Sequence, residues 1–195
     1  AGIMASHSIR LEFLPKTPSA RCLIVGPTSS GKSHLAGNIA GWLRNPFAWV
    51  NVSLLTPPGY KGYDTNAAMM QLAKANTKDD GQKVPSVLVL DEIDKAMRRA
   101  KDSAWLQQLQ YSLLPILGGE RINISDENGN APDKLYYTQH TLVLMMGVFP
   151  EIPTRAWTNE SSARAALVKY GFCEEFVSRL THIISLDKLD RTEIR

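Results

Sequence analysis

Short apolar runs alternate along this chain with longer stretches in which apolar residues recur every three or four positions. Continuous apolar runs are typical of strands covered on both faces, and the longer periodicity is typical of amphipathic helices. The alternation predicts an α/β fold with a mainly parallel sheet between helices. The expected strands are residues 21–26, 47–52, 86–91 and 140–146, and the expected helices are residues 32–44, 64–76, 103–117, 161–170 and 173–180.

Two further patterns refine this expectation. Between residues 121 and 138, two strand-like runs flank a cluster of turn-forming residues, so we expect an exposed hairpin or loop there. The expected helix at 32–44 carries apolar residues at helical spacing, which predicts that this face packs on the sheet. These residues are Leu35, Ile39, Trp42 and Leu43.

A glycine-rich segment between the first strand and the first helix indicates phosphate binding. Residues 26–33 read G-x-x-x-x-G-K-S, and the glycines let backbone N–H groups approach a phosphate. Lys32 can then reach the β- and γ-phosphates, and the Ser33 hydroxyl can bind Mg²⁺. The expected nucleotide-binding residues are Gly26, Pro27, Thr28, Ser29, Ser30, Gly31, Lys32, Ser33 and His34.

Two carboxylates, Asp91 and Glu92, follow the apolar run 87–90. At the carboxyl end of a parallel strand, Asp91 can hold Mg²⁺ while Glu92 orients and deprotonates an attacking water. Alone, the pair would suit the start of a helix equally well. Together with the phosphate loop, it predicts an enzyme that hydrolyses a nucleoside triphosphate with Mg²⁺, and the resemblance described next implies that this nucleotide is ATP.

Five segments, in order, resemble those of the AAA+ ATPases, specifically the Clp and HslU unfoldase branch that includes ClpX. The resemblance implies a P-loop NTPase three-layer sandwich, the AAA+ large subdomain, at residues 21–186. Residues 1–20 would be an N-terminal extension, and residues 187–195 would begin a linker to a small helical lid domain that this chain lacks. The matching segments are residues 26–33, 59–62, 90–95, 113–119 and 175–180.

The same resemblance assigns residues that spacing alone does not. Arg179 corresponds to the arginine finger that reaches the nucleotide of a neighbouring subunit, and Tyr60 and Lys61 fall in the pore loop that grips polypeptide. It implies a homo-oligomeric ring, a hexamer, that unfolds or remodels protein. The sequence departs from the family in Lys61, which replaces an aliphatic residue. It also lacks an Asn or Thr near the end of 142–147 to position water, and a peptidase-docking I-G-F or L-G-F tripeptide.

Composition narrows the function classes further. The 195 residues are 44% hydrophobic with a net charge of +3, and no run approaches the ~20 apolar residues of a membrane span, so we expect no membrane partner. Two distant cysteines favour a reducing cytoplasm. A motor, loader or switch acting on nucleic acid remains the alternative, because Lys61, Tyr63 and the basic stretch 95–101 could contact a strand. A non-hydrolysing interaction module is disfavoured by Lys32, Asp91 and Glu92.

Overall fold

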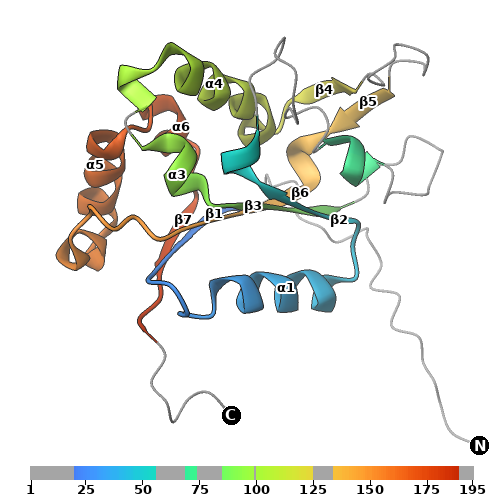
Figure 1. Ribbon diagram of the computed structural model, residues 1–195. Coiled ribbons are helices and arrows are strands. Elements are labelled where there is room, and N and C mark those ends of the chain that lie inside the picture. Colours follow the sequence, from blue (N-terminus) through green and yellow to red (C-terminus); the bar gives the residue numbers. More distant parts are fainter. Residues whose placement is uncertain (1–19, 56–68, 74–84, 99, 125–133, 189–195) are drawn as a thin grey trace, which may run out of the picture.

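The central element of the computed structural model is a five-stranded parallel sheet (Figure 1). The structure describes residues 20–55, 69–73, 85–98, 100–124 and 134–188. Neighbouring strands of the sheet follow the order β2-β3-β6-β1-β7, and every neighbouring pair is parallel. The strands are β1 (Arg21–Val25), β2 (Phe47–Asn51), β3 (Ser86–Asp91), β6 (Thr141–Gly147) and β7 (His182–Ser185).

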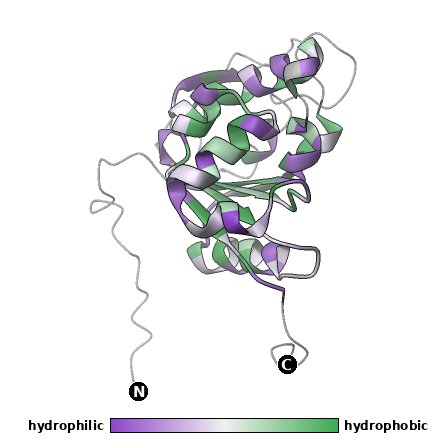
Figure 2. Ribbon diagram, turned by 90° about the vertical axis from the view of Figure 1, so that its left-hand side faces the viewer, coloured by the Kyte–Doolittle hydropathy of each residue, from purple (hydrophilic) through white to green (hydrophobic). Residues whose placement is uncertain are grey.

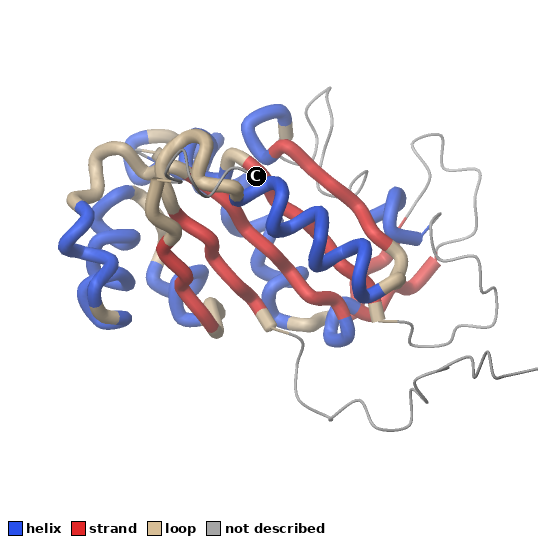
Figure 3. Tube along the Cα trace, turned by 90° about the horizontal axis from the view of Figure 1, so that it is seen from below, coloured by secondary structure: helices blue, strands red, loops and turns tan. Residues whose placement is uncertain are grey.

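Helices cover both faces of this sheet, which confirms the expected three-layer α/β architecture (Figures 1 and 3). Among the described helices, α1 (Lys32–Leu43) lies on one face. The opposite face carries α3 (Ile93–Met97), α4 (Ala104–Gly118), α5 (Glu160–Tyr170) and α6 (Glu174–Ser178). Single 3₁₀ turns occur at η2 (Val52–Leu54), η3 (Ala100–Asp102), η4 (Thr138–His140) and η5 (Thr154–Thr158).

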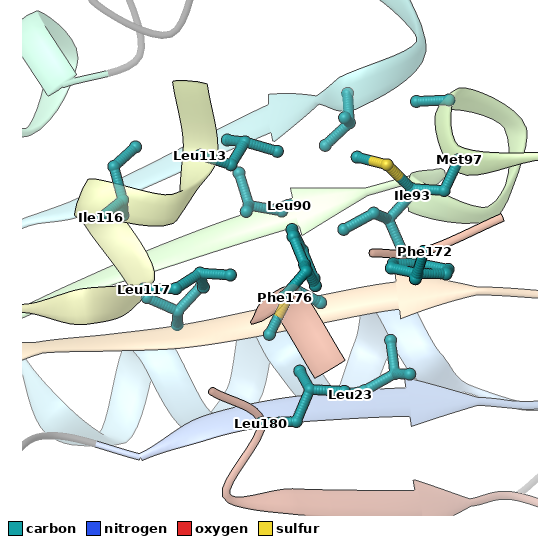
Figure 4. Close-up of a cluster of buried hydrophobic side chains, with 14 of the residues drawn as sticks. Leu23, Leu90, Ile93, Met97, Leu113, Ile116, Leu117, Phe172, Phe176 and Leu180 are labelled. Carbon is teal, nitrogen blue, oxygen red and sulfur yellow. The ribbon is translucent and has the colours of Figure 1, made fainter. Parts of the chain in front are cut away.

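The main hydrophobic core lies between the sheet and the helices opposite α1 (Figure 4). Leu23 and Leu90 project from the sheet and meet apolar side chains of α3, α4 and the segment that carries α6. The strands are mainly hydrophobic and lie between the helical layers (Figure 2). Burial on both faces fixes the strands, so their carboxyl ends form a firm platform. The labelled partners in the core are Ile93, Met97, Leu113, Ile116, Leu117, Phe172, Phe176 and Leu180.

The predicted packing face of α1 is confirmed for Leu35 and Ile39, which are partly buried against the core on this side of the sheet, and is wrong for Trp42 and Leu43. The buried residues of this helix are Ala36 and Ala40, whereas Trp42 is 82% exposed and Leu43 is 45% exposed. The small alanine side chains let the helix approach the strands closely, with Ile24 among the residues of that core. The two large residues of the last turn therefore stay outside it.

The strand β7 is absent from the sequence prediction. That prediction places the ATPase domain at residues 21–186, with a short helix at 173–180 as its last element. It is short and pairs with β1, placing His182 opposite Cys22. Three of its four residues, His182, Ile184 and Ser185, are exposed, and its apolar run is too brief to stand out in the sequence.

The expected hairpin is present at β4 (Arg121–Ile124) and β5 (Lys134–Tyr137), which pair antiparallel. The Tyr136 hydroxyl donates to Ser86 Oγ at 2.7 Å and so attaches the hairpin to the start of β3. The expected turn at 125–133 lies outside the described residues. In the expected helix at 64–76, residues 69–73 are described and are helical.

A buried arginine at the start of β1 joins several of these elements. Arg21 is 2% exposed and donates from Nε to the Leu117 carbonyl at 3.1 Å and from Nη1 to the Thr141 carbonyl at 2.7 Å. Burial lowers the pKa of its guanidinium to about 10. The side chain satisfies carbonyls at the end of α4 and fastens that helix to the sheet.

Candidate active site

A pocket of about 530 Å³ lies where β1, β3 and β6 reach their carboxyl ends. All three strands are parallel, so the loops that follow them meet at one edge of the sheet. The pocket brings the predicted phosphate loop together with the predicted carboxylate pair. Its lining residues are Thr28, Ser29, Ser30, Gly31, Lys32, Ser33, His34, Asp91, Glu92, Asp94, Lys95, Gly147 and Val148.

The two glycines of the loop are required by its geometry. A Cβ atom at Gly26 would lie 2.6 Å from the Leu186 carbonyl oxygen and 2.9 Å from Ser30 Oγ, closer than real side chains come. Gly31 has φ +81°, in the left-handed region, where it caps α1. The loop therefore presents backbone at the N-terminus of a twelve-residue helix, which is the arrangement that binds phosphate.

Lys32 is held inside the loop by its own backbone. Its ammonium donates to the carbonyls of Gly26 at 2.8 Å and Pro27 at 2.7 Å, and to Ser30 Oγ at 3.3 Å. Burial lowers its pKa, and the nearby carboxylates of Asp91 and Asp94 oppose that shift. The ammonium can reach a phosphate by exchanging these neutral acceptors for anionic ones.

The residues around the loop fit a divalent cation. Ser33, in the first turn of α1, and Asp91, at the end of β3, line the same pocket and offer a hydroxyl and a carboxylate. Mg²⁺ prefers such oxygen ligands and usually completes its shell with water and substrate phosphates. Among the described residues, no group of three or more His, Cys, Asp or Glu side chains that could hold a metal ion is found.

Glu92 is restrained by three donors from neighbouring segments. Its Oε2 accepts from Asn51 Nδ2 at 2.9 Å and Ser53 Oγ at 3.0 Å, and its Oε1 pairs with Lys95 Nζ at 2.5 Å. These hydrogen bonds, with that from Lys95 the largest contribution, hold the pKa of Glu92 below its ordinary value. A carboxylate so engaged is a weaker base, so general-base chemistry requires its release from Asn51, Ser53 and Lys95.

Arg179 is not among the residues that line this pocket. It ends α6, where its Nη2 pairs with Glu175 Oε1 at 2.6 Å and its Nη1 donates to the Leu114 carbonyl of α4. Its guanidinium therefore rests on the end of α4 within its own chain. To act on a nucleotide, Arg179 would have to reach a pocket other than the one described here, or exchange its bonds to Glu175 and Leu114.

The pore-loop residues Tyr60 and Lys61 lie outside the described residues, so their prediction stays a prediction. Sequence reasoning missed the residues that hold Glu92. Among them, Asn51 could have been found, because it is a polar residue at the end of the mainly apolar strand β2, which pairs with β3. It also missed Asp94, two positions beyond Glu92.

None of the described helices is long and apolar enough to cross a bilayer.

The fold and the pocket define a P-loop nucleotide-binding domain: a parallel sheet, a glycine loop between β1 and α1, and acidic residues at the end of β3. Sequence comparison specifies the family, because the profile of the AAA domain (Cdc48 subfamily) matches residues 17–183. The chain belongs to this family, and it is a ClpX-like AAA+ ATPase module.

Three curated relatives illustrate the similarity. The ATP-dependent Clp protease ATP-binding subunit ClpX of Porphyromonas gingivalis is 28% identical over 205 residues, covering 89% of this chain and 50% of that protein. ClpX 2 of Wolinella succinogenes is 27% identical, covering 94% and 50%. ClpX of Borrelia duttonii is 27% identical, covering 88% and 47%. The chain thus spans about half the length of the curated relatives it matches.

Proposed function

We propose that this chain is the Mg²⁺-dependent, ATP-hydrolysing module of a ring-forming machine that unfolds or remodels polypeptides. The observation that carries the proposal is the convergence of Lys32, Asp91 and Glu92 on one pocket. A cationic phosphate ligand, a cation ligand and a general base are the parts that phosphoryl transfer to water requires.

Each of these residues has a distinct task in the proposed reaction. The Lys32 ammonium exchanges loop carbonyls for phosphate oxygens, and Ser33 and Asp91 hold Mg²⁺. The bound cation neutralises charge on the phosphates. Glu92, once free of Asn51, Ser53 and Lys95, accepts the proton of the attacking water.

The polypeptide client is supported by the relatives, which are named as ATP-binding subunits of an ATP-dependent protease. By that similarity we propose a ring of six copies in the cytoplasm. In this ring Arg179 completes the site of a neighbour, and Tyr60 and Lys61 contact the polypeptide. Of the two client classes that the sequence leaves open, polypeptide is the one that the relatives support.

The proposal is tested with Lys32→Ala, which removes the ammonium and leaves the loop backbone. Two charge-assisted hydrogen bonds of ~1.5 kcal/mol each correspond to an affinity loss of at least ~100-fold. Binding of a fluorescent ATP analogue with Mg²⁺, together with phosphate release, measures the effect. The control Lys169→Ala alters an exposed lysine of α5 outside the pocket. Equal affinity of Lys32→Ala and Lys169→Ala would refute the nucleotide site.

A further inference from the structure

Asp94, in the first turn of α3, is a buried carboxylate to which the chemistry above gives no task. It is 6% exposed and lines the phosphate pocket. Within the described residues, no hydrogen bond or ion pair to its carboxylate is found. The other buried polar side chains there all have hydrogen-bond partners: Arg21, Ser30, Ser86, Gln110, Thr138 and Thr141.

Two lysines of the pocket interact with Asp94 but donate no hydrogen bond to it. Lys32 and Lys95 both interact with Asp94 electrostatically. The hydrogen bonds of Lys32 go to its own loop, and the ammonium of Lys95 pairs with Glu92. A buried charge without hydrogen bonds lowers the stability of the folded state. Such a cost is typical of functional sites, where a group awaits a ligand.

The position of Asp94 indicates what it can contact. A Cβ atom at Gly147, the last residue of β6, would lie 2.9 Å from Asp94 Oδ1, so the carboxylate lies against the end of that strand. The strand β6 lies between β1, which carries the phosphate loop, and β3, which carries Asp91. Gly147 and Val148 give the pocket no polar side chain at this point. Asp94 supplies one instead.

Asp94 and Glu92 also lie toward different strands. Glu92 is bound by Asn51 and Ser53, which end and follow β2, on the side of β3 away from β6. Asp94 contacts the end of β6 on the other side. In-line attack is faster when the attacking water is oriented as well as deprotonated, and an acceptor on the side opposite the base can hold that orientation.

We propose that Asp94 is this second acceptor: it orients the attacking water by accepting one of its hydrogen bonds, while Glu92 takes the other proton. The water oxygen bonds to the terminal phosphorus as the bond from that phosphorus to the bridging oxygen breaks. The electron pair of the broken bond leaves with ADP. The inference rests on the proposed function, since it refines ATP hydrolysis in the same pocket.

The test is Asp94→Asn, which keeps the size of the side chain and removes its charge. We expect single-turnover ATP hydrolysis to fall at least ~10-fold, with affinity for a fluorescent ATP analogue and the Mg²⁺ requirement changed less than about twofold. The melting temperature of the nucleotide-free chain should stay equal or rise, because an unpaired buried charge is removed. The matched control Asp102→Asn, at an exposed carboxylate of η3, should change none of these measurements.

Each other outcome overturns the inference. A lower melting temperature or weaker ATP binding would make Asp94 structural, and an unchanged rate would remove its task. A rate restored by excess Mg²⁺ would make it a cation ligand. Failure of the proposed function is recognised separately, because the wild-type chain would then bind or hydrolyse no ATP, and the inference would fall with it.

Discussion

At the scale of single residues, Lys32 and Glu92 are held by bonds within the chain that the proposed catalysis must exchange. Lys32 is satisfied by loop carbonyls and Glu92 by Asn51, Ser53 and Lys95. An ammonium that gives up neutral acceptors for phosphate oxygens gains stronger, charge-assisted hydrogen bonds. Glu92 has no such direct gain, so its proposed action as a base depends on release from these three donors.

Removing the proposed base should separate binding from turnover. Glu92→Gln keeps the shape of the side chain and can still contact Asn51, but its amide cannot accept a proton. We expect ATP to stay bound while hydrolysis falls at least ~100-fold. Phosphate release and retention of labelled ATP measure the two effects, with Glu174→Gln, at an exposed position of α6, as the control. Normal turnover by Glu92→Gln would assign the base to another group.

At the scale of secondary-structure elements, α4 and α6 together determine where Arg179 lies. The end of α4 provides the Leu114 carbonyl, and Glu175 on α6 pairs with the guanidinium. A cation near the carbonyl end of a helix is stabilised by the helix dipole. These contacts hold the Arg179 guanidinium within its own chain. The proposed contact with a neighbour's nucleotide would have to replace them.

If Arg179 acts on a neighbouring subunit, a mixed ring should lose more ATP hydrolysis than the fraction of its subunits that carry the mutation. Arg179→Ala should bind ATP normally, and mixing it with wild type should depress hydrolysis beyond the mutant fraction. Activity is measured across mixing ratios, with mixtures containing Arg155→Ala, an exposed arginine of η5, as the control. A strictly proportional loss would place the action of Arg179 within its own subunit, or exclude a catalytic role.

At the scale of the whole molecule, a parallel sheet carries the chemistry at one edge, and the proposed mechanical work belongs to an assembly of copies. The resemblance assigns that work to Tyr60. Since Tyr60 is separate in sequence from the phosphate loop and the carboxylates, its loss should leave hydrolysis intact and remove the response to the client.

Tyr60→Ala tests both client classes in one experiment. We expect basal ATP hydrolysis to persist while stimulation by an unfolded polypeptide is lost. Tyr111→Ala, at a tyrosine of α4 that is 54% exposed, is the control. A fall of roughly 5- to 150-fold in single-stranded DNA affinity, from ~1–3 kcal/mol of base stacking, would instead indicate a nucleic-acid client. If neither response changes, Tyr60 is not a pore-loop contact.

Much of this molecule could be predicted from the sequence, because local patterns carry the relevant physics. The apolar run of β3 is buried on both faces, and its predicted bounds match the structure exactly at residues 86–91. The phosphate loop follows from spacing, since Gly26 and Gly31 are needed wherever the backbone must approach an anion. The fold class and the family were therefore readable before any coordinate.

Only the tertiary structure decided which residues distant in the chain contact one another. Asn51 reaches Glu92 because β2 and β3 are neighbours, and Asp94 is buried because α3 packs against the end of β6. Similarly, Arg21 is buried because the end of α4 lies over the start of β1. Sequence periodicity states which face of an element is apolar, but a polar side chain acquires its partner, or remains without one, through the packing of whole elements.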